Sequence, residues 1–157
     1  MAADPSEALF AQSALIRDWL AQLPYVSFGL PSVLPGWDVR VLTGHVLMVH
    51  RGLQGALQQP TDAAPLALHD YVARYRPDHE QIDAMTLQLA ADRTPDDLLT
   101  ELDLAVQDLR GRLAEPLPKV VVAPRGPVTA ADYLSTRVIE LLAHAEDLSR
   151  SLPDRAP

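Results

Sequence analysis

The sequence of 157 residues contains no cysteine and a single lysine, Lys119. The absence of cysteine excludes disulfides and a cysteine nucleophile, so any thiol chemistry would require a thiol supplied by another molecule. The net charge is −8, and the twelve arginines are scattered along the chain without forming a basic cluster. Because binding to nucleic acid depends on concentrated positive charge, we do not expect a nucleic-acid partner.

The sequence shows no long apolar run, and its first residues do not have the pattern of a secretory leader. The first ten residues carry Asp4 and Glu7 where a signal peptide has basic residues, and no apolar run approaches the ~20 residues that cross a bilayer. We therefore expect a cytoplasmic protein without a membrane partner. The length, together with 48% hydrophobic and 22% charged residues, is typical of one globular domain covering residues 1–157.

Capping residues mark the starts of four long amphipathic segments. Short oxygen-bearing side chains satisfy free amide groups in the first turn of a helix, and proline fits its first position. Such a residue precedes each segment: Asp4, Asp38, Thr94 and Thr129. Apolar residues at helical spacing then predict helices from Pro5 to about Leu23, from Val39 to about Leu57, from Pro95 to about Leu113 and from Ala130 to about Leu152.

Prolines and glycines interrupt the periodic pattern in two of the long connections. Residues 24–37 contain three prolines and two glycines, which predict an ordered but irregular segment. Residues 114–128 contain four prolines and therefore exclude a helix. Within them, residues 119–122 predict a short extended piece for which no partner strand is visible.

A third connection has helical character of its own. Residues 68–75 predict a short helix, which Arg76 and Pro77 interrupt before a second helical piece over 78–91. The apolar positions of that second piece are Ile82, Met85 and Leu89. The whole pattern predicts an all-α fold, a four-helix bundle with long irregular connections and an extra short or broken helix.

Glu140 and His144 lie one helical turn apart in the last predicted helix. Residues at that spacing are ~5–6 Å apart at Cβ, so both can reach one cation from the same side. Zinc accepts histidine nitrogen and carboxylate oxygen, and a catalytic zinc site has three protein ligands and one open position. With Arg137 and Asp147, the pair forms a polar stripe that favours an internal cleft. A solvated helix face is the alternative, and a third ligand must come from elsewhere.

His45 falls within the apolar stripe of the second predicted helix. A histidine at such a position is either a core residue with satisfied hydrogen bonds or a ligand. Because ligand sites in bundles are built from facing helices, the second and last helices can bring His45 to Glu140 and His144. His50, about 140° further round the helix, is expected at the solvent or at a helix edge. Two other histidines are expected at the surface: His69 and His79.

Two short motifs contain the candidate ligands. The first is PGWDVR at 35–40, followed by Gly44 and His45, and the second is RVIE at 137–140, followed by His144, Asp147 and Leu148. Together and in this order, they resemble the metal-binding domain of mycothiol-dependent maleylpyruvate isomerase, within the DinB-like superfamily. The resemblance implies a four-helix bundle that binds a divalent metal through a histidine of the second helix and a Glu/His pair of the last. These roles correspond to His45, Glu140 and His144.

The resemblance also implies a cofactor, a low-molecular-weight thiol such as mycothiol, and zinc as the usual metal. The donor set itself also accepts nickel, iron or cobalt. The isomerase has an additional C-terminal domain that contacts its substrate, so that substrate is not expected to carry over. Abundant arginine and alanine with scarce lysine indicate a high-GC genome, which agrees with an actinobacterial host that uses mycothiol.

The resulting hypothesis is a metal-dependent thiol S-transferase or isomerase that acts on a small electrophile, with the metal stabilising the attacking thiolate. Arg137 would hold a carboxylate of the thiol or substrate, or orient Glu140. Asp147 would orient the imidazole of His144, and ordinary ion pairs are the alternative for both residues. A noncatalytic metal- or ligand-binding bundle and a metal-free interaction module, such as a homodimer, also fit. The sequence therefore does not decide whether the chain is an enzyme.

Overall fold

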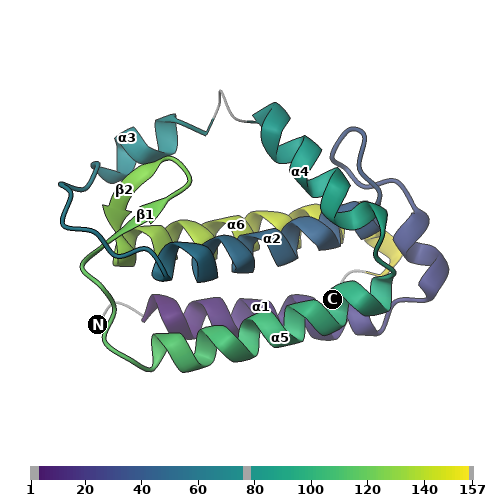
Figure 1. The fold of residues 1–157 in the computed structure, drawn as a ribbon. Helices are drawn as coiled ribbons and strands as arrows, with labels where there is room; N and C mark the ends of the chain where they lie inside the picture. The colour runs from purple at the N-terminus through teal and green to yellow at the C-terminus, as the bar shows by residue number, and fades with distance from the viewer. Residues whose placement is uncertain (1–3, 76–78, 156–157) are drawn as a thin grey trace.

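Four long helices form where the capped apolar segments predict them. In the computed structural model, which describes residues 4–75 and 79–155, these are α1 (Pro5–Ala21), α2 (Val39–Leu57), α5 (Pro95–Leu113) and α6 (Ala130–Ser151). Between and after them lie the shorter elements η1 (Tyr25–Gly29), α3 (Leu68–Ala73), α4 (His79–Ala91), β1 (Val120–Ala123), β2 (Gly126–Thr129) and η3 (Pro153–Arg155). The prediction of an all-α bundle is confirmed (Figure 1). No helix in this described part of the chain is long and apolar enough to cross a membrane.

The helix starts are fixed by the side chains that the sequence predicts as caps. Asp38 accepts a hydrogen bond from the amide of Val41 at 2.7 Å. Thr94 and Asp97 form a reciprocal capping box, in which each side chain accepts a bond from the amide of the other, at 3.2 and 2.9 Å. These bonds satisfy amide groups that have no partner within the helix. α1 ends at Ala21, slightly earlier than predicted.

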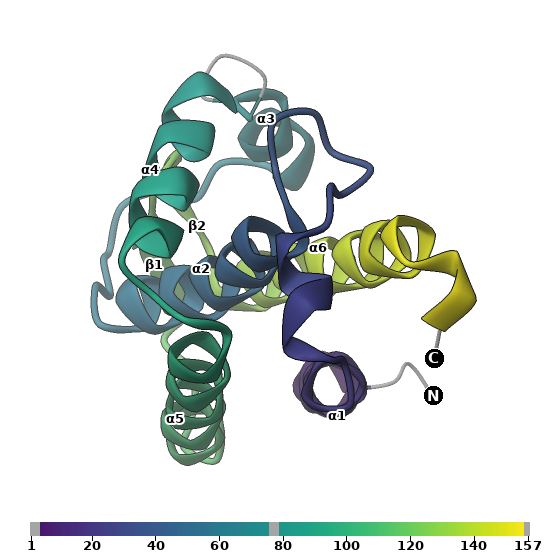
Figure 2. The ribbon, with the colours of Figure 1, turned by 90° about the vertical axis from the view of Figure 1, so that its right-hand side faces the viewer.

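α2 lies at the centre of the molecule. Figure 1 shows α2 and α6 running side by side over α1 and α5, and in Figure 2 α4 lies on the side of α2 that faces away from α5. α2 contacts α4, α5, α6, β1 and η1, and one core of buried apolar side chains joins the four long helices. Most of α2 is therefore buried, including three polar residues: Thr43, His45 and His50.

A hairpin occupies the segment for which the sequence predicts only an isolated extended piece. β1 pairs with β2 in antiparallel register, and Val121 lies opposite Val128. Gly126 adopts a φ of 122°, which side chains of L-residues rarely permit, and so allows the tight reversal. The partner strand is not visible in the sequence because β2 begins with glycine and proline, which are scarce in strands. The carbonyl of Pro127 accepts a hydrogen bond from Leu66, which ties the loop after α2 to the hairpin.

α4 packs on α2 mainly through small and polar residues. The buried residues of α4 are Thr86 and Ala90, whereas Met85, one of its three apolar positions, is half exposed. Ala90 lies against Gly44 of α2, where an added Cβ would come within 3.4 Å of the alanine methyl group. Small residues at this contact let the helices approach and bring the polar Thr86 into the interior. The predicted break at residues 76–77 lies outside the described residues.

His50 is buried, contrary to the expectation that it faces solvent or a helix edge. Its exposed fraction is 1%, Nδ1 donates to the carbonyl of Val46 at 2.8 Å, and Nε2 lies 2.7 Å from the hydroxyl oxygen of Ser13 in α1. The expectation failed because it assumes one buried face, whereas α2 is surrounded on several sides. The polar bonds on this second side keep the imidazole satisfied without water.

The burial of His50 predicts a loss of stability as the pH falls. Burial lowers the pKa of the imidazole below its ordinary value of 6.5. The unfolded chain therefore takes up a proton that the folded chain does not, so the free energy of unfolding is largest above pH 6.5 and decreases below it. This residue contributes a slope of at most ~1.4 kcal/mol per pH unit. The free energy of unfolding, measured by urea denaturation at a series of pH values, should depend less steeply on pH in His50→Gln than in the unaltered protein. Equal pH dependence in the two proteins would contradict the prediction.

Candidate metal centre

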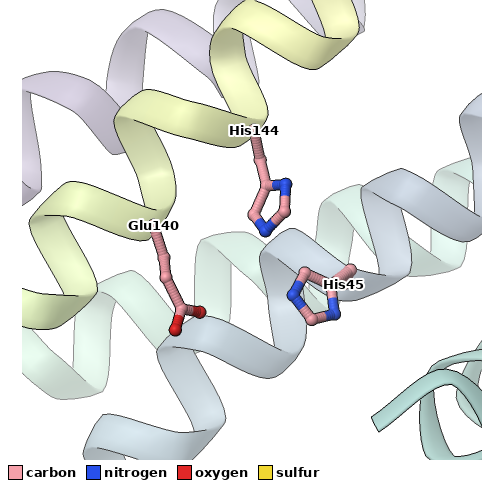
Figure 3. A group of neighbouring side chains, drawn as sticks. All are labelled: His45, Glu140 and His144. Carbon is pink, nitrogen blue, oxygen red and sulfur yellow. The ribbon is translucent and has the colours of Figure 1, made fainter. Parts of the chain in front are cut away.

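Three side chains from two helices converge between α2 and α6. His45 comes from α2, and Glu140 and His144 come from adjacent turns of α6 (Figure 3). Each offers a ligand atom, and these atoms lie within 4.8 Å of one another. The juxtaposition that the sequence predicts is therefore present in the structure. Metal coordination by these residues stays a prediction.

The two imidazole rings meet edge to face. Their centroids are 4.6 Å apart with an interplanar angle of 84°. The indole of Trp37, which lies just before α2, packs 5.1 Å from the ring of His45, and its own exposed fraction is only 8%. The PGWDVR motif thus places an aromatic wall beside the histidine, which excludes water from that side of the site.

His45 is held as a neutral ligand candidate. Burial, followed by the charges of His144 and Arg137, lowers the pKa of His45 from 6.5 to about 3. Its Nδ1 lies 3.1 Å from the hydroxyl oxygen of Thr86 in α4. Nε2 is the remaining nitrogen, and an unprotonated nitrogen on a neutral ring is the form of histidine that binds metals.

His144 is oriented by a carboxylate on its own helix. Nδ1 lies 3.1 Å from an oxygen of Asp147, one turn further along α6. A histidine that gives its Nδ1 proton to such an acceptor presents the other nitrogen with its lone pair free. The pairing of Asp147 with His144 is the contact that the sequence predicts. It leaves Nε2 as the nitrogen available to the centre.

Glu140 is paired with the buried guanidinium of Arg137. Two nitrogens of Arg137 lie 2.8 and 3.3 Å from the carboxylate oxygens, and the arginine has an exposed fraction of 6%. The guanidinium also donates to the hydroxyl of Tyr75 and lies over the ring of Tyr133, 4.6 Å from its centroid. These contacts favour the orienting role predicted for Arg137 over the binding of a free carboxylate, because its donors already have acceptors.

The residues that support the three donors include several that the sequence analysis passed over. Thr86 was missed because a lone threonine in a helix has no distinguishing signal. Tyr75 and Tyr133 were also given no role at the site. Burial raises the pKa of both phenols, that of Tyr133 to about 12, although the charge of Arg137 acts in the opposite direction. They therefore stay protonated as neutral neighbours of the ion pair. The two histidines predicted at the surface are both exposed there: His69 and His79.

The donor set fits a divalent cation. Two histidine nitrogens and one carboxylate oxygen are a ligand set found in catalytic zinc sites, where a fourth position stays open for water or substrate. The arrangement is semi-exposed, with His45 buried and the other two donors of intermediate exposure. The centre is therefore not fully enclosed by protein. No other group of three such donors that could hold a metal is found within residues 4–75 and 79–155.

Known proteins share the fold of this chain. The family described as the mycothiol maleylpyruvate isomerase N-terminal domain matches residues 9–149. A crystal structure of a mycothiol-dependent maleylpyruvate isomerase matches with a TM-score of 0.68 at 18% identity, covering 93% of this chain and 60% of that chain. A variant of such an isomerase with one histidine replaced by alanine gives a TM-score of 0.70 at the same identity and coverage. No curated protein matches the sequence. The chain thus spans 60% of the length of these two structures, and at 18% identity the likeness shows the fold.

Proposed function

The chain belongs to the mycothiol maleylpyruvate isomerase N-terminal domain family, and on that premise we propose that it binds a divalent metal ion through His45, Glu140 and His144. The observation that supports this proposal is the convergence of three donors from α2 and α6 within 4.8 Å. A Glu/His pair one turn apart is common on solvated helix faces. A third donor, buried and neutral, brought to the same point by a different helix is not explained by that alternative.

Zinc is the proposed ion, with nickel as the second choice. Neutral imidazoles and a carboxylate suit both metals, and availability decides between them as much as affinity does. When bound at such a site, the ion acts as a Lewis acid that lowers the pKa of a coordinated thiol. The chain has no cysteine, so the thiol would be a separate small molecule.

The proposed activity is thiol-dependent chemistry on a small electrophile, as an S-transferase or an isomerase. A mycothiol-type thiol is supported by the names of the family and of the two matching structures, because each name includes the word mycothiol. In this proposal His45 and His144 supply neutral nitrogens, Glu140 supplies the negative charge, and Arg137 fixes the direction of its carboxylate. We further propose that residues 1–157 form one domain and that it works in the cytoplasm of an actinobacterium that makes mycothiol.

A metal-free helical interaction module is the competing hypothesis. The observation in its favour is the ion pair between Arg137 and Glu140, which neutralises the carboxylate without a metal ion. The two hypotheses differ in their response to chelators. A metal protein loses stability when its ion is removed, whereas an interaction module melts at the same temperature with and without EDTA.

Cobalt substitution tests the thiol step directly. Cobalt(II) accepts the same ligands as zinc and absorbs visible light according to its coordination. We expect the cobalt protein to develop a sulfur-to-metal charge-transfer band on addition of mycothiol or N-acetylcysteine. The alcohol analogue, N-acetylserine, is the matched control and should give no such band. A protein that binds cobalt but shows no band with either thiol would contradict thiol coordination while leaving metal binding intact.

A further inference from the structure

Thr86 of α4 ends a buried hydrogen-bond chain that begins at His45. The threonine side chain is fully buried, and its hydroxyl oxygen lies 3.1 Å from Nδ1 of His45. The same oxygen lies 2.8 Å from the carbonyl oxygen of Ile82, one turn earlier in α4. The sulfur of Met48 lies 3.3 Å from it as well. A carbonyl oxygen and a thioether sulfur can only accept, so the single hydroxyl proton is directed to one of these two groups. The lone pairs of the hydroxyl then face His45, which must donate from Nδ1.

This direction of donation selects one of the two neutral forms of the imidazole. A neutral ring carries its proton either on Nδ1 or on Nε2, and only the unprotonated nitrogen can bind a metal. With the proton on Nδ1, Nε2 presents its lone pair toward Glu140 and His144. Without an acceptor at Nδ1, the ring can place its proton on Nε2, where it would block coordination.

We propose that Thr86 is a positioning residue that holds His45 in the form with Nε2 unprotonated and so completes the ligand set. The inference rests on the proposed metal site and extends it to a third helix, since α4 supplies none of the three donors. The two histidines are then oriented by unlike groups, His45 by a neutral hydroxyl and His144 by the carboxylate of Asp147.

Gly44 explains how α4 comes close enough for this contact. A Cβ added at Gly44 would approach the side chains of Leu89 and Ala90 to 3.2 and 3.4 Å, so glycine lets the two helices lie against each other. Gly44 precedes His45, and Thr86 is one turn before Ala90. The glycine in the Gly44-His45 motif therefore acquires a physical role: it sets the distance over which Thr86 reaches the imidazole.

The test compares Thr86→Val, which keeps the shape of the side chain and removes the hydroxyl, with Thr86→Ser, which keeps the hydroxyl. Competition with a zinc chelator should show a zinc affinity about 10- to 100-fold lower for Thr86→Val, the range found when partners of metal-binding histidines are removed. Thr86→Ser should remain close to the unaltered protein. Long-range proton–nitrogen NMR of the metal-free protein, with His45 assigned through His45→Ala, should show the Nε2 proton appearing in Thr86→Val only.

Two results would overturn the inference. One is a zinc affinity of Thr86→Val within about twofold of a parent that binds zinc. The other is an unprotonated Nδ1 on His45 in the unaltered, metal-free protein. If the parent binds no zinc, the metal proposal fails, yet the NMR measurement still decides whether Thr86 sets the form of His45. Thermal melting of both variants is the control for folding: a variant that melts near the temperature of the parent has kept its fold, so a loss of zinc affinity in it comes from the site.

Discussion

Replacing either His45 or His144 with alanine should lower the metal content of the purified protein from about one divalent ion per chain to near zero. Each histidine supplies one of only three donors, and two donors are too few to hold a zinc ion through purification. Elemental analysis of untagged protein, prepared without chelator, provides the measurement. The two variants should agree, because the donors come from different helices but meet at one point.

His69→Ala is the matched control for this experiment. His69 is exposed in α3 and pairs with the neighbouring Asp70, so its removal changes the histidine count without touching the centre. It should keep the metal content of the parent. If all three variants retain the ion, the metal lies elsewhere, and if the parent carries none and melts at the same temperature in EDTA, the chain shares only the fold of its family.

Replacing Arg137 with methionine should destabilise the metal-free protein more than the metal-loaded one. Arg137 is buried and paired with Glu140 at 2.8 Å. Removing one partner of a buried ion pair leaves the charge of the other without compensation. Such losses reach ~3–5 kcal/mol, and partial exposure of Glu140 should reduce the value here to about 2–3 kcal/mol. A bound cation would neutralise the same carboxylate. Urea denaturation should therefore show that Arg137→Met lowers the free energy of unfolding less when zinc is present than when it is absent.

A double-mutant cycle separates the charge effect from the loss of packing against Tyr133. Glu140→Gln removes the charge that would be left uncompensated. Arg137→Met should therefore lower the free energy of unfolding less in that background than in the parent. The difference measures the coupling of the two residues. Equal losses in both backgrounds would show that Arg137 acts through packing alone. Equal losses with and without zinc in the parent background would argue against a cation beside Glu140.

The helices could be read from the sequence because their determinants are local. Asp38 and Thr94 precede clear apolar periods, and a cap acts within three residues of itself. The hairpin was not predicted because β2 begins with Gly126 and Pro127, two residue types with a low propensity for strands. Its pairing with Val121 and the packing of the strands on α2 and α6 are tertiary effects.

The three candidate donors were accessible to sequence reasoning, but their surroundings were only partly so. Asp147 shares a helix with His144, so a spacing of three residues was enough to propose the contact. Thr86 reaches His45 from another helix, and nothing in a sequence reports the distance between α2 and α4. The misplacement of His50 has the same origin, since one helical period describes one buried face and α2 has several.

The position of the donors along the chain also governs the order in which the molecule can be assembled. His45 and Glu140 are about 95 residues apart, so a chain growing from its N-terminus completes α2 long before α6 exists. Until α6 docks, His45 can contact Trp37 and Thr86 but lacks the other two candidate ligands, which both lie in α6. Closing so long a loop has a conformational-entropy cost of its own, which the packing of α6 must overcome. If the proposed site binds an ion, the complete ligand set can form only once α6 has docked, so metal binding would also report on the docking of α6.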